Sequence, residues 1–162
     1  MRPSGLIPIV VPDFHGDSSC IEKVATSDLD VFAHNIETVE ELQSMVRDQC
    51  ANFKQSIEVL RMAKDYAPAS TLTKTSIMLG CGETPDKVIG TMEKVRAAGI
   101  DVITFGQYMR PSKRHMPVSE YVTPEAFEKH RSLGMEMWVY VWQGFRYSYK
   151  VGEFYIKSMI RS

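Results

Sequence analysis

The sequence has 162 residues, of which 44% are hydrophobic, and this is enough for one domain with a substantial core. Nineteen basic against twenty acidic residues leave a net charge of −1, which excludes nothing by itself but gives no support to nucleic-acid or anionic-membrane binding. No apolar run approaches the roughly 18 residues of a membrane span, and residues 1–5 are too short for a signal or transit peptide. We therefore expect a globular protein with neither a membrane nor a nucleic acid as its partner.

Apolar runs and helical periodicity alternate along the chain. The apolar runs predict strands at residues 6–11, 30–33, 76–79, 100–105 and 137–142. Helical spacing predicts helices from residue 17 to about 26, from residue 38, over 53–66, from residue 84 to about 98, from residue 123 to about 133, and near 154–160. This alternation predicts an α/β fold with a parallel sheet, either a TIM-type barrel or a doubly wound sheet.

Two observations narrow these alternatives. About five strands are too few for a closed eight-stranded barrel. A dinucleotide-binding fold is disfavoured because no Gly-x-Gly-x-x-Gly motif follows the first strand, and no P-loop is present.

Helix starts are marked by capping residues. Asp17 is the expected cap of the first helix, and Thr38 with Glu41 has the spacing of a capping box. The second helix should then turn Val39, Leu42, Met45 and Val46 inward. Thr84 and Thr123 are each followed by proline, the typical start of a further helix.

The stretch at residues 74–83 is predicted to be a buried strand that ends in a glycine-rich turn. Residues 76–79 are mostly apolar without strict alternation, which is typical of a strand covered on both faces. Gly80 and Gly82 allow a tight turn and the close approach of a ligand. The carboxyl end of this strand therefore has the features of a binding site.

The three cysteines, Cys20, Cys50 and Cys81, are about thirty residues apart. Neither a disulfide framework nor a metal site has this spacing. We expect three reduced thiols, two in helices and one in the glycine turn. A nucleophilic Cys81 is the less favoured alternative, because its neighbours include no obvious base.

Polar side chains follow each of the first four predicted strands, and ligands bind at the carboxyl ends of parallel strands. We expect one shared rim that carries Asp13, His15, His34, Asn35, Glu37, Glu83, Gln107, Tyr108, Arg110 and His115. Residues 34–37 could orient a polar ligand or cap the next helix, and the basic residues 110–115 could attract a carboxylate or phosphate or be solvated. The basic, aromatic run at 146–150 is too short to indicate nucleic-acid binding.

The chain resembles the lipoyl synthase family of radical S-adenosylmethionine (SAM) enzymes from about residue 6 to its end. Four motifs carry the resemblance: Pro-Asp-Phe-His-Gly-Asp at 12–17, Asp-Val-Phe-Ala-His-Asn-Ile-Glu-Thr at 30–38, Lys-Thr-Ser-Ile-Met-Leu-Gly-Cys-Gly-Glu at 74–83, and Gly-Gln-Tyr-Met-Arg-Pro-Ser-Lys-Arg-His at 106–115. The resemblance is closest to eukaryotic, mitochondrial forms, so it implies a mitochondrial location.

The resemblance implies a partial (β/α) TIM-type barrel and the insertion of two sulfur atoms into a protein-bound octanoyl group. The family's cofactors are SAM and two [4Fe–4S] clusters, held mainly by two cysteine motifs in the amino-terminal half. This chain lacks both motifs, so it is similar to a carboxyl-terminal portion and should be inactive alone. The implied partners are octanoylated lipoyl-domain proteins, such as H protein and the E2 component of 2-oxoacid dehydrogenases, and an electron donor such as ferredoxin.

Individual site residues follow from the same resemblance. Asn35, Glu37 and Lys74 match positions expected to face SAM, and Arg110 and His115 belong to the loop on the substrate side. Ser148, in Arg-Tyr-Ser-Tyr at 146–149, falls on the serine that coordinates the auxiliary cluster, although residues 137–144 depart from the family's Ser-Gly-Pro turn.

The expected organisation is a non-homologous or disordered start at 1–5, a partial barrel at 6–142, and a tail at 143–162. An incomplete sheet should expose an apolar edge and promote aggregation or oligomerisation. Two alternatives to the enzyme remain open. One is a degenerate binding or assembly module for lipoyl-domain proteins, and the other is an unrelated barrel enzyme that uses His34, His115 and Glu83 in acid–base chemistry.

Overall fold

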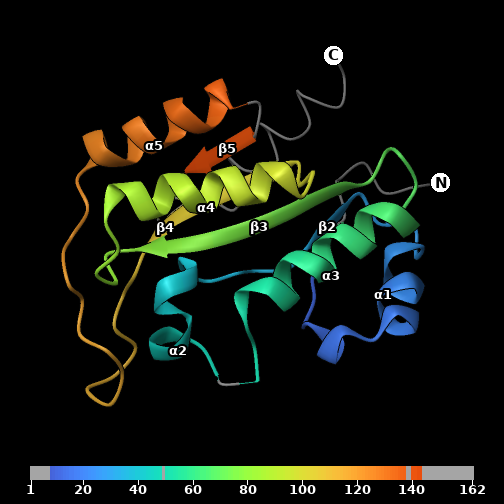
Figure 1. Ribbon diagram of the computed structural model, residues 1–162, viewed down its shortest axis with the longest axis horizontal. Coiled ribbons are helices and arrows are strands. Elements are labelled where there is room, and N and C mark those ends of the chain that lie inside the picture. The colour runs from blue at the N-terminus through green and yellow to red at the C-terminus, as the bar shows by residue number, and fades with distance from the viewer. Residues whose placement is uncertain (1–7, 49, 138–139, 144–162) are drawn as a thin grey trace.

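In the computed structural model, residues 8–48, 50–137 and 140–143 are described, and their strands form one five-stranded sheet (Figure 1). The strands are β1 (Pro8–Val10), β2 (Val31–Ala33), β3 (Leu72–Leu79), β4 (Val102–Gln107) and β5 (Tyr140–Gln143). All neighbours pair in parallel, and their order in space is their order in the chain. This is the arrangement of an open (β/α) barrel, because a doubly wound sheet reverses its strand order. The predicted fold class is confirmed.

The helices are α1 (Ser18–Ala25), α2 (Gln43–Val46), α3 (Phe53–Tyr66), α4 (Pro85–Ala97) and α5 (Pro124–Glu136), with 3-10 turns η1 (Phe14–Gly16) and η2 (Glu40–Leu42). Asp17 caps α1 by accepting hydrogen bonds from two backbone N–H groups, and Thr123 caps α5, both as predicted. None of the helices in the described ranges is long and apolar enough to cross a membrane.

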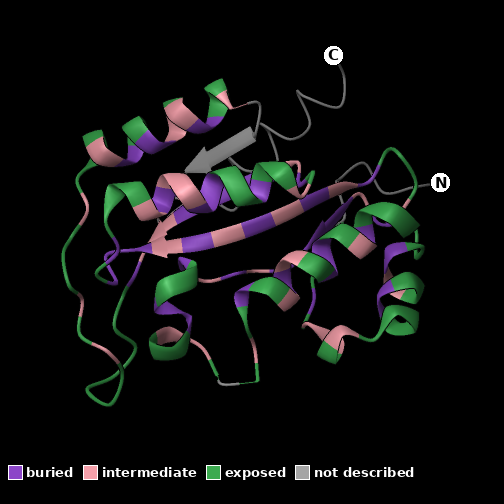
Figure 2. Cartoon of the chain, viewed as in Figure 1, coloured by how far each residue is buried: buried purple, intermediate pink, exposed green. Residues whose placement is uncertain are grey.

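The core lies between the helices and one face of the sheet. Ile77 and Leu79 of β3 pack there with Leu60 of α3 and Met92 of α4. Burial therefore alternates along β3: Thr73, Thr75, Ile77 and Leu79 are buried, whereas Leu72, Lys74, Ser76 and Met78 are half-buried (Figure 2). The strand was predicted to be covered on both faces, but the helices cover only one of them, and the residues on the other face are half-buried.

The register places one row of residues across the other face. Val10 pairs with Ala33, Ala33 with Lys74, and Lys74 with Val102. Register partners in a parallel sheet point to the same side, so these residues share the face opposite the helical core.

The expected capping box at Thr38 and Glu41 does not form. The cap of η2 is Val39, which has no side-chain hydrogen bond, and Met45, predicted to face inward, is 60% exposed. The physical cause lies just upstream: the Glu37 N–H donates to the Ser76 carbonyl (3.0 Å), and the Glu37 carbonyl accepts from Met78 N–H (2.8 Å). These bonds hold the chain against β3, so the next turn starts late and as a 3-10 turn.

Only part of the carboxyl-terminal region belongs to the described residues. The last predicted strand is present as β5, slightly later than expected. Ser148 and the predicted helix near 154–160 lie outside the described residues.

Candidate functional site

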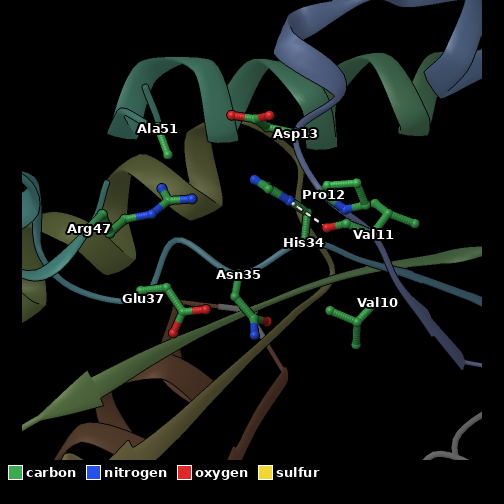
Figure 3. A pocket seen from close by; sticks show the side chains of 9 residues that line it. All are labelled: Val10, Val11, Pro12, Asp13, His34, Asn35, Glu37, Arg47 and Ala51. Atoms are coloured by element: carbon green, nitrogen blue, oxygen red, sulfur yellow. Dashed lines mark hydrogen bonds between the residues drawn. The ribbon is translucent and has the colours of Figure 1, made fainter. Parts of the chain in front are cut away.

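A cavity of about 290 Å³ lies at the carboxyl ends of β1 and β2 (Figure 3). Its polar lining consists of Asp13, His34, Asn35, Glu37 and Arg47. Four of these five belong to the rim that the sequence predicts, and β1 and β2 bring them together because their carboxyl ends meet at one edge of the sheet. Of the residues assigned to SAM, Asn35 and Glu37 line this cavity.

Glu37 adopts a left-handed backbone conformation, with φ +65°. Such a conformation is strained for a residue other than glycine and persists where the surroundings fix it. Here the two hydrogen bonds to β3 fix it, together with an isolated parallel bridge to Ile77. The backbone of Glu37 is therefore fixed at the cavity, which its side chain lines.

His34 is buried, 4% exposed, and both ring nitrogens are engaged. Nδ1 lies 2.9 Å from the Val11 carbonyl, which only accepts, so Nδ1 carries the proton. Nε2 lies 3.0 Å from Ser56 Oγ. Burial lowers the pKa of His34, and the positive charge of Arg47 acts in the same direction. The ring is therefore neutral, and Nε2 accepts the Ser56 hydroxyl hydrogen.

Arg47 completes this network. Its Nη1 donates to Ser56 Oγ (2.8 Å) and to Gln43 Oε1 (3.1 Å). Gln43 is itself fixed because its Nε2 donates to two backbone carbonyls. Burial lowers the pKa of Arg47, while the carboxylates of Glu37 and Asp13 oppose that effect. No ion pair of Arg47 is found within the described part of the chain, although its guanidinium lines the cavity (Figure 3).

The charges around the cavity suit a ligand that carries charges of both signs. Arg47 offers an oriented guanidinium to a carboxylate or phosphate. Glu37 offers a carboxylate to an ammonium group, and the Asn35 amide can both donate and accept. Asp13 is less available, because its carboxylate accepts from His15 N–H and from Gln55 Nε2. The amino-acid end of a small molecule has the matching chemistry.

The glycine turn after β3, predicted to let a ligand approach, is instead packed against other parts of the chain at Gly80. Glu83 closes the turn: its two carboxylate oxygens accept from the N–H groups of Gly80 (2.6 Å) and Cys81 (2.9 Å). A Cβ on Gly80, which has φ +94°, would lie 2.4 Å from Gln107 Nε2 and 2.4 Å from the Glu120 carbonyl. The close approach that glycine permits at Gly80 is made by Gln107, the last residue of β4, and by Glu120 in the segment that follows, so the expectation that a ligand approaches at Gly80 is wrong.

Lys74 is not among the residues that line the cavity. It lies within β3, half-buried, and burial lowers the pKa of its ammonium group. Its ammonium group makes no hydrogen bond or ion pair with another residue in the described ranges. Lys74 nevertheless lies beside the segment that carries Asn35 and Glu37, because it is the register partner of Ala33 and its carbonyl accepts from His34 N–H (3.0 Å).

Arg110 and His115 hold the basic loop in shape. Arg110 Nε donates to the His115 carbonyl (2.8 Å), and its Nη2 donates to the Lys113 carbonyl. His115 Nδ1 is 2.9 Å from Ser112 Oγ. The loop is exposed throughout, and it presents the charges of Lys113 and Arg114 to the solvent.

The cysteines in the described residues do not fit an iron–sulfur cluster. Cys20 and Cys50 are exposed and Cys81 is buried, and no three Cys, His, Asp or Glu residues in the described ranges form a metal-binding group. Cys50 lies in a turn and not, as predicted, in a helix. Burial and the charge of Glu83 raise the pKa of Cys81 to about 11, so its thiol is protonated and a poor nucleophile.

Sequence reasoning missed Arg47, Gln43 and Ser56. Ser56 faces inward at helical spacing from Leu60 and Phe53, which is a weak signal for a buried hydroxyl. Nothing in the local sequence links it to Arg47, because the contact is made between two separate helical segments.

The curated proteins that are similar to the chain are mitochondrial lipoyl synthases. No family model matches the chain. Over its full length the chain is 76% identical to the mitochondrial lipoyl synthase of Sorghum bicolor, 74% identical to that of Medicago truncatula and 72% identical to that of Arabidopsis thaliana. It spans 43%, 44% and 44% of the length of these relatives, respectively.

Proposed function

Because the chain is homologous over its full length to the mitochondrial lipoyl synthases but spans less than half of their length, we propose that it supplies the SAM-binding side of such an enzyme. In the complete enzyme, SAM together with an iron–sulfur cluster supplies the radical chemistry for inserting two sulfur atoms into a protein-bound octanoyl group. The place of action is the mitochondrion, as the names of the relatives indicate. This chain alone is inactive, because the cysteine spacing of its sequence does not suit a [4Fe–4S] cluster.

The observation that carries the proposal is that Arg47, Glu37 and Asn35 line one cavity. SAM ends in an amino acid, so it brings a carboxylate and an ammonium group to the same site. Arg47 binds the carboxylate, and Glu37 with Asn35 binds the ammonium. The neighbouring His34 is neutral and holds Arg47 in place through Ser56. His34 therefore positions Arg47 and does not transfer a proton.

The other assignments from the family are also part of the proposal. Lys74 faces the cofactor from the sheet, Ser148 coordinates the auxiliary cluster, and Arg110 and His115 shape the loop that meets the substrate protein. The substrate is an octanoylated lipoyl-domain protein, such as H protein or an E2 component, and a ferredoxin-like protein donates electrons. The exposed charges of Lys113 and Arg114 support this side of the proposal, because they would attract an acidic protein surface.

Calorimetric titration of the chain with SAM tests the cavity directly. We expect Arg47→Gln to weaken binding by about tenfold or more, because a charge-assisted contact is lost. Glu37→Gly should also weaken binding, yet stabilise the fold, because glycine relieves the left-handed strain. Arg61→Gln is the matched control: Arg61 is exposed on α3 and forms ion pairs with Glu58 and Asp65, so its loss should leave the affinity unchanged. Equal affinity of the Arg47→Gln and Arg61→Gln variants would contradict the proposal.

A non-catalytic binding module is the second candidate, and the cavity lined by Asn35, Glu37 and Arg47, which are groups that bind a polar ligand, supports it. It predicts binding of an octanoylated lipoyl domain by this chain without any turnover, even when the missing part of the enzyme is added. Turnover in that mixture would exclude it.

A further inference from the structure

Gln43 lies between the two charged parts of the site without lining the cavity itself. It is the first residue of α2, only 7% exposed, and it is not among the residues that surround the cavity. A buried amide side chain needs partners for its N–H groups and for its carbonyl oxygen, because a polar group left unpaired in the interior is costly. The partners of Gln43 belong to the two segments that carry the charges of the cavity.

The amide nitrogen of Gln43 holds the segment of Glu37. Nε2 donates to the Ile36 carbonyl and to the Thr38 carbonyl, each at 2.8 Å. Backbone carbonyls only accept hydrogen bonds, so these two contacts fix the orientation of the amide. Ile36 and Thr38 directly precede and follow Glu37, whose backbone is in the left-handed conformation. Gln43 therefore binds the backbone on both sides of this strained residue.

The amide oxygen of Gln43 holds Arg47. Arg47 Nη1 donates to Gln43 Oε1 (3.1 Å) and to Ser56 Oγ (2.8 Å), so both hydrogens of this nitrogen are used. Ser56 can accept, because its own hydrogen goes to Nε2 of the neutral His34. Within the described ranges, Nε and Nη2 of Arg47 have no hydrogen-bond partner. These two nitrogens form one edge of the planar guanidinium, and that edge fits the two oxygens of a carboxylate.

One buried side chain thus connects the cation and the anion that line the cavity (Figure 3). Neither the Arg47 guanidinium nor the backbone of Glu37 can shift without the loss of a buried hydrogen bond to Gln43. A ligand whose carboxylate and ammonium are attached to the same carbon presents its two charges at a short, fixed separation. A site that holds its own two charges in a fixed relation favours such a ligand over one that carries only one of these charges.

We propose that Gln43 is a positioning residue that fixes the Arg47 guanidinium relative to Glu37, so that the site selects an α-amino acid end whose carboxylate binds the free Nε–Nη2 edge of Arg47. The inference rests on the proposed function, since that function identifies SAM as the ligand. Gln43 does not line the cavity, so it acts through Arg47 and Glu37, and Ser56 is the second anchor of the guanidinium.

Calorimetric titration of the full chain with two ligands tests the selectivity. SAM carries the amino-acid end, whereas 5′-methylthioadenosine keeps the adenosine and the sulfur but lacks that end. We expect Gln43→Met, which has a side chain of similar length, to weaken SAM binding by about tenfold and to leave the affinity for 5′-methylthioadenosine unchanged. Thr91→Ala is the control: Thr91 is buried on α4, its hydroxyl donates to the Lys87 carbonyl (2.9 Å), and it does not line the cavity, so both affinities should stay unchanged.

Nitrogen-15 NMR of the arginine side chains tests the anchoring without any ligand. Because both hydrogens of Arg47 Nη1 are held, rotation about its Nε–Cζ bond should be slow, and its two Nη nitrogens should give separate signals. Arg96, exposed on α4, is the internal reference and should give one averaged signal. The Arg47 signals are identified by their loss in Arg47→Gln, and they should broaden or merge in Gln43→Met and in Ser56→Ala.

Far-ultraviolet circular dichroism establishes whether Gln43→Met is folded; if it is not, Ser56→Ala takes its place in both measurements. A selective loss of SAM binding, with separate Arg47 signals in the parent chain that merge in the variant, supports the inference. An unchanged affinity for SAM, an equal loss for both ligands, or one averaged Arg47 signal in the parent chain would overturn it. A parent chain that does not bind SAM would count against the proposed function, and the NMR signals would still show whether Gln43 anchors Arg47.

Discussion

Arg47 and Glu37 reach the cavity from different segments, and the side chain of Arg47 and the backbone of Glu37 are fixed before a ligand arrives. Arg47 is held by Gln43 and Ser56, and Glu37 is held by its backbone bonds to β3. Such fixed groups lose little conformational freedom on binding, so more of the interaction contributes to affinity. The motif of residues 34–37 indicated a polar site in advance. Arg47 could not be predicted, because its partners meet it only after the chain has folded.

Histidine protonation should make the stability depend on pH. His34 and His130 are both buried, and burial lowers the pKa of each. The unfolded chain then binds more protons than the folded chain, so stability is complete above the ordinary histidine pKa of about 6.5 and declines as the pH falls toward the lowered values. Urea unfolding at pH 7.5 and pH 5.5 should give a lower free energy of unfolding at pH 5.5.

The variant His130→Phe separates the contributions of His34 and His130 to the pH dependence of stability. The His130 ring lies 5.8 Å from the ring of Phe105, centroid to centroid, and its buried Nδ1 has no hydrogen-bond partner among the residues that the structure describes. An apolar ring at this position avoids the cost of burying that nitrogen, so we expect a gain of about 1 kcal/mol at pH 7.5 and a larger gain at pH 5.5. A variant with the same stability and the same pH dependence as the parent chain would contradict this account of His130.

Among the elements, the glycine turn after β3 shows how a binding motif can serve the fold. Gly80 and Gly82 both have positive φ, and Glu83 accepts from the turn amides. The end of β4 and the segment after it pack on Gly80. Gln107 connects the parts, since its amide contacts carbonyls of Leu79 and Glu120. The strand, turn and helix were predictable from spacing. The groups that pack against Gly80 were not predictable from spacing, because Gln107 and Glu120 come from a later part of the chain.

Two alanine substitutions compare the tightly packed Gly80 with Gly90, a glycine that has open space around it. In Gly80→Ala the new Cβ meets Gln107 and Glu120 at 2.4 Å on a backbone with φ +94°, so we expect a loss of about 2 kcal/mol or more. In Gly90→Ala, within α4, a Cβ has no atom within 4 Å, and a gain of about 0.5–1 kcal/mol is expected from helix propensity. Urea unfolding of both variants is the measurement. A Gly80→Ala chain as stable as the Gly90→Ala chain would refute the packing described for the turn.

The elements also show where local sequence decides the structure and where it does not. The helix α3 begins and ends at the predicted residues, because Asn52 caps it and Pro68 follows it. The helix predicted from residue 38 has a proper capping-box sequence, yet pairing of Glu37 with β3 takes precedence. Long-range hydrogen bonds can therefore overrule a local signal that is correct by itself.

For the molecule as a whole, the alternating pattern was enough to predict a parallel sheet of about five strands. The sequence also predicted an incomplete sheet with an apolar edge, and in the described residues that edge is β1, with Ile9 and Val10 exposed. The burial alternation of β3 was not predicted, because short apolar runs do not reveal which face the helices cover. The open edge and the cavity beside it agree with a chain that spans less than half of its relatives.

The most direct test of the proposed function is anaerobic reconstitution of this chain with iron and sulfide, followed by addition of SAM and a reductant. We predict that the chain binds SAM, acquires no stoichiometric [4Fe–4S] absorbance and does not cleave SAM, because its three cysteines are too far apart to hold the cluster. A stoichiometric cluster together with cleavage of SAM by this chain alone would contradict the account.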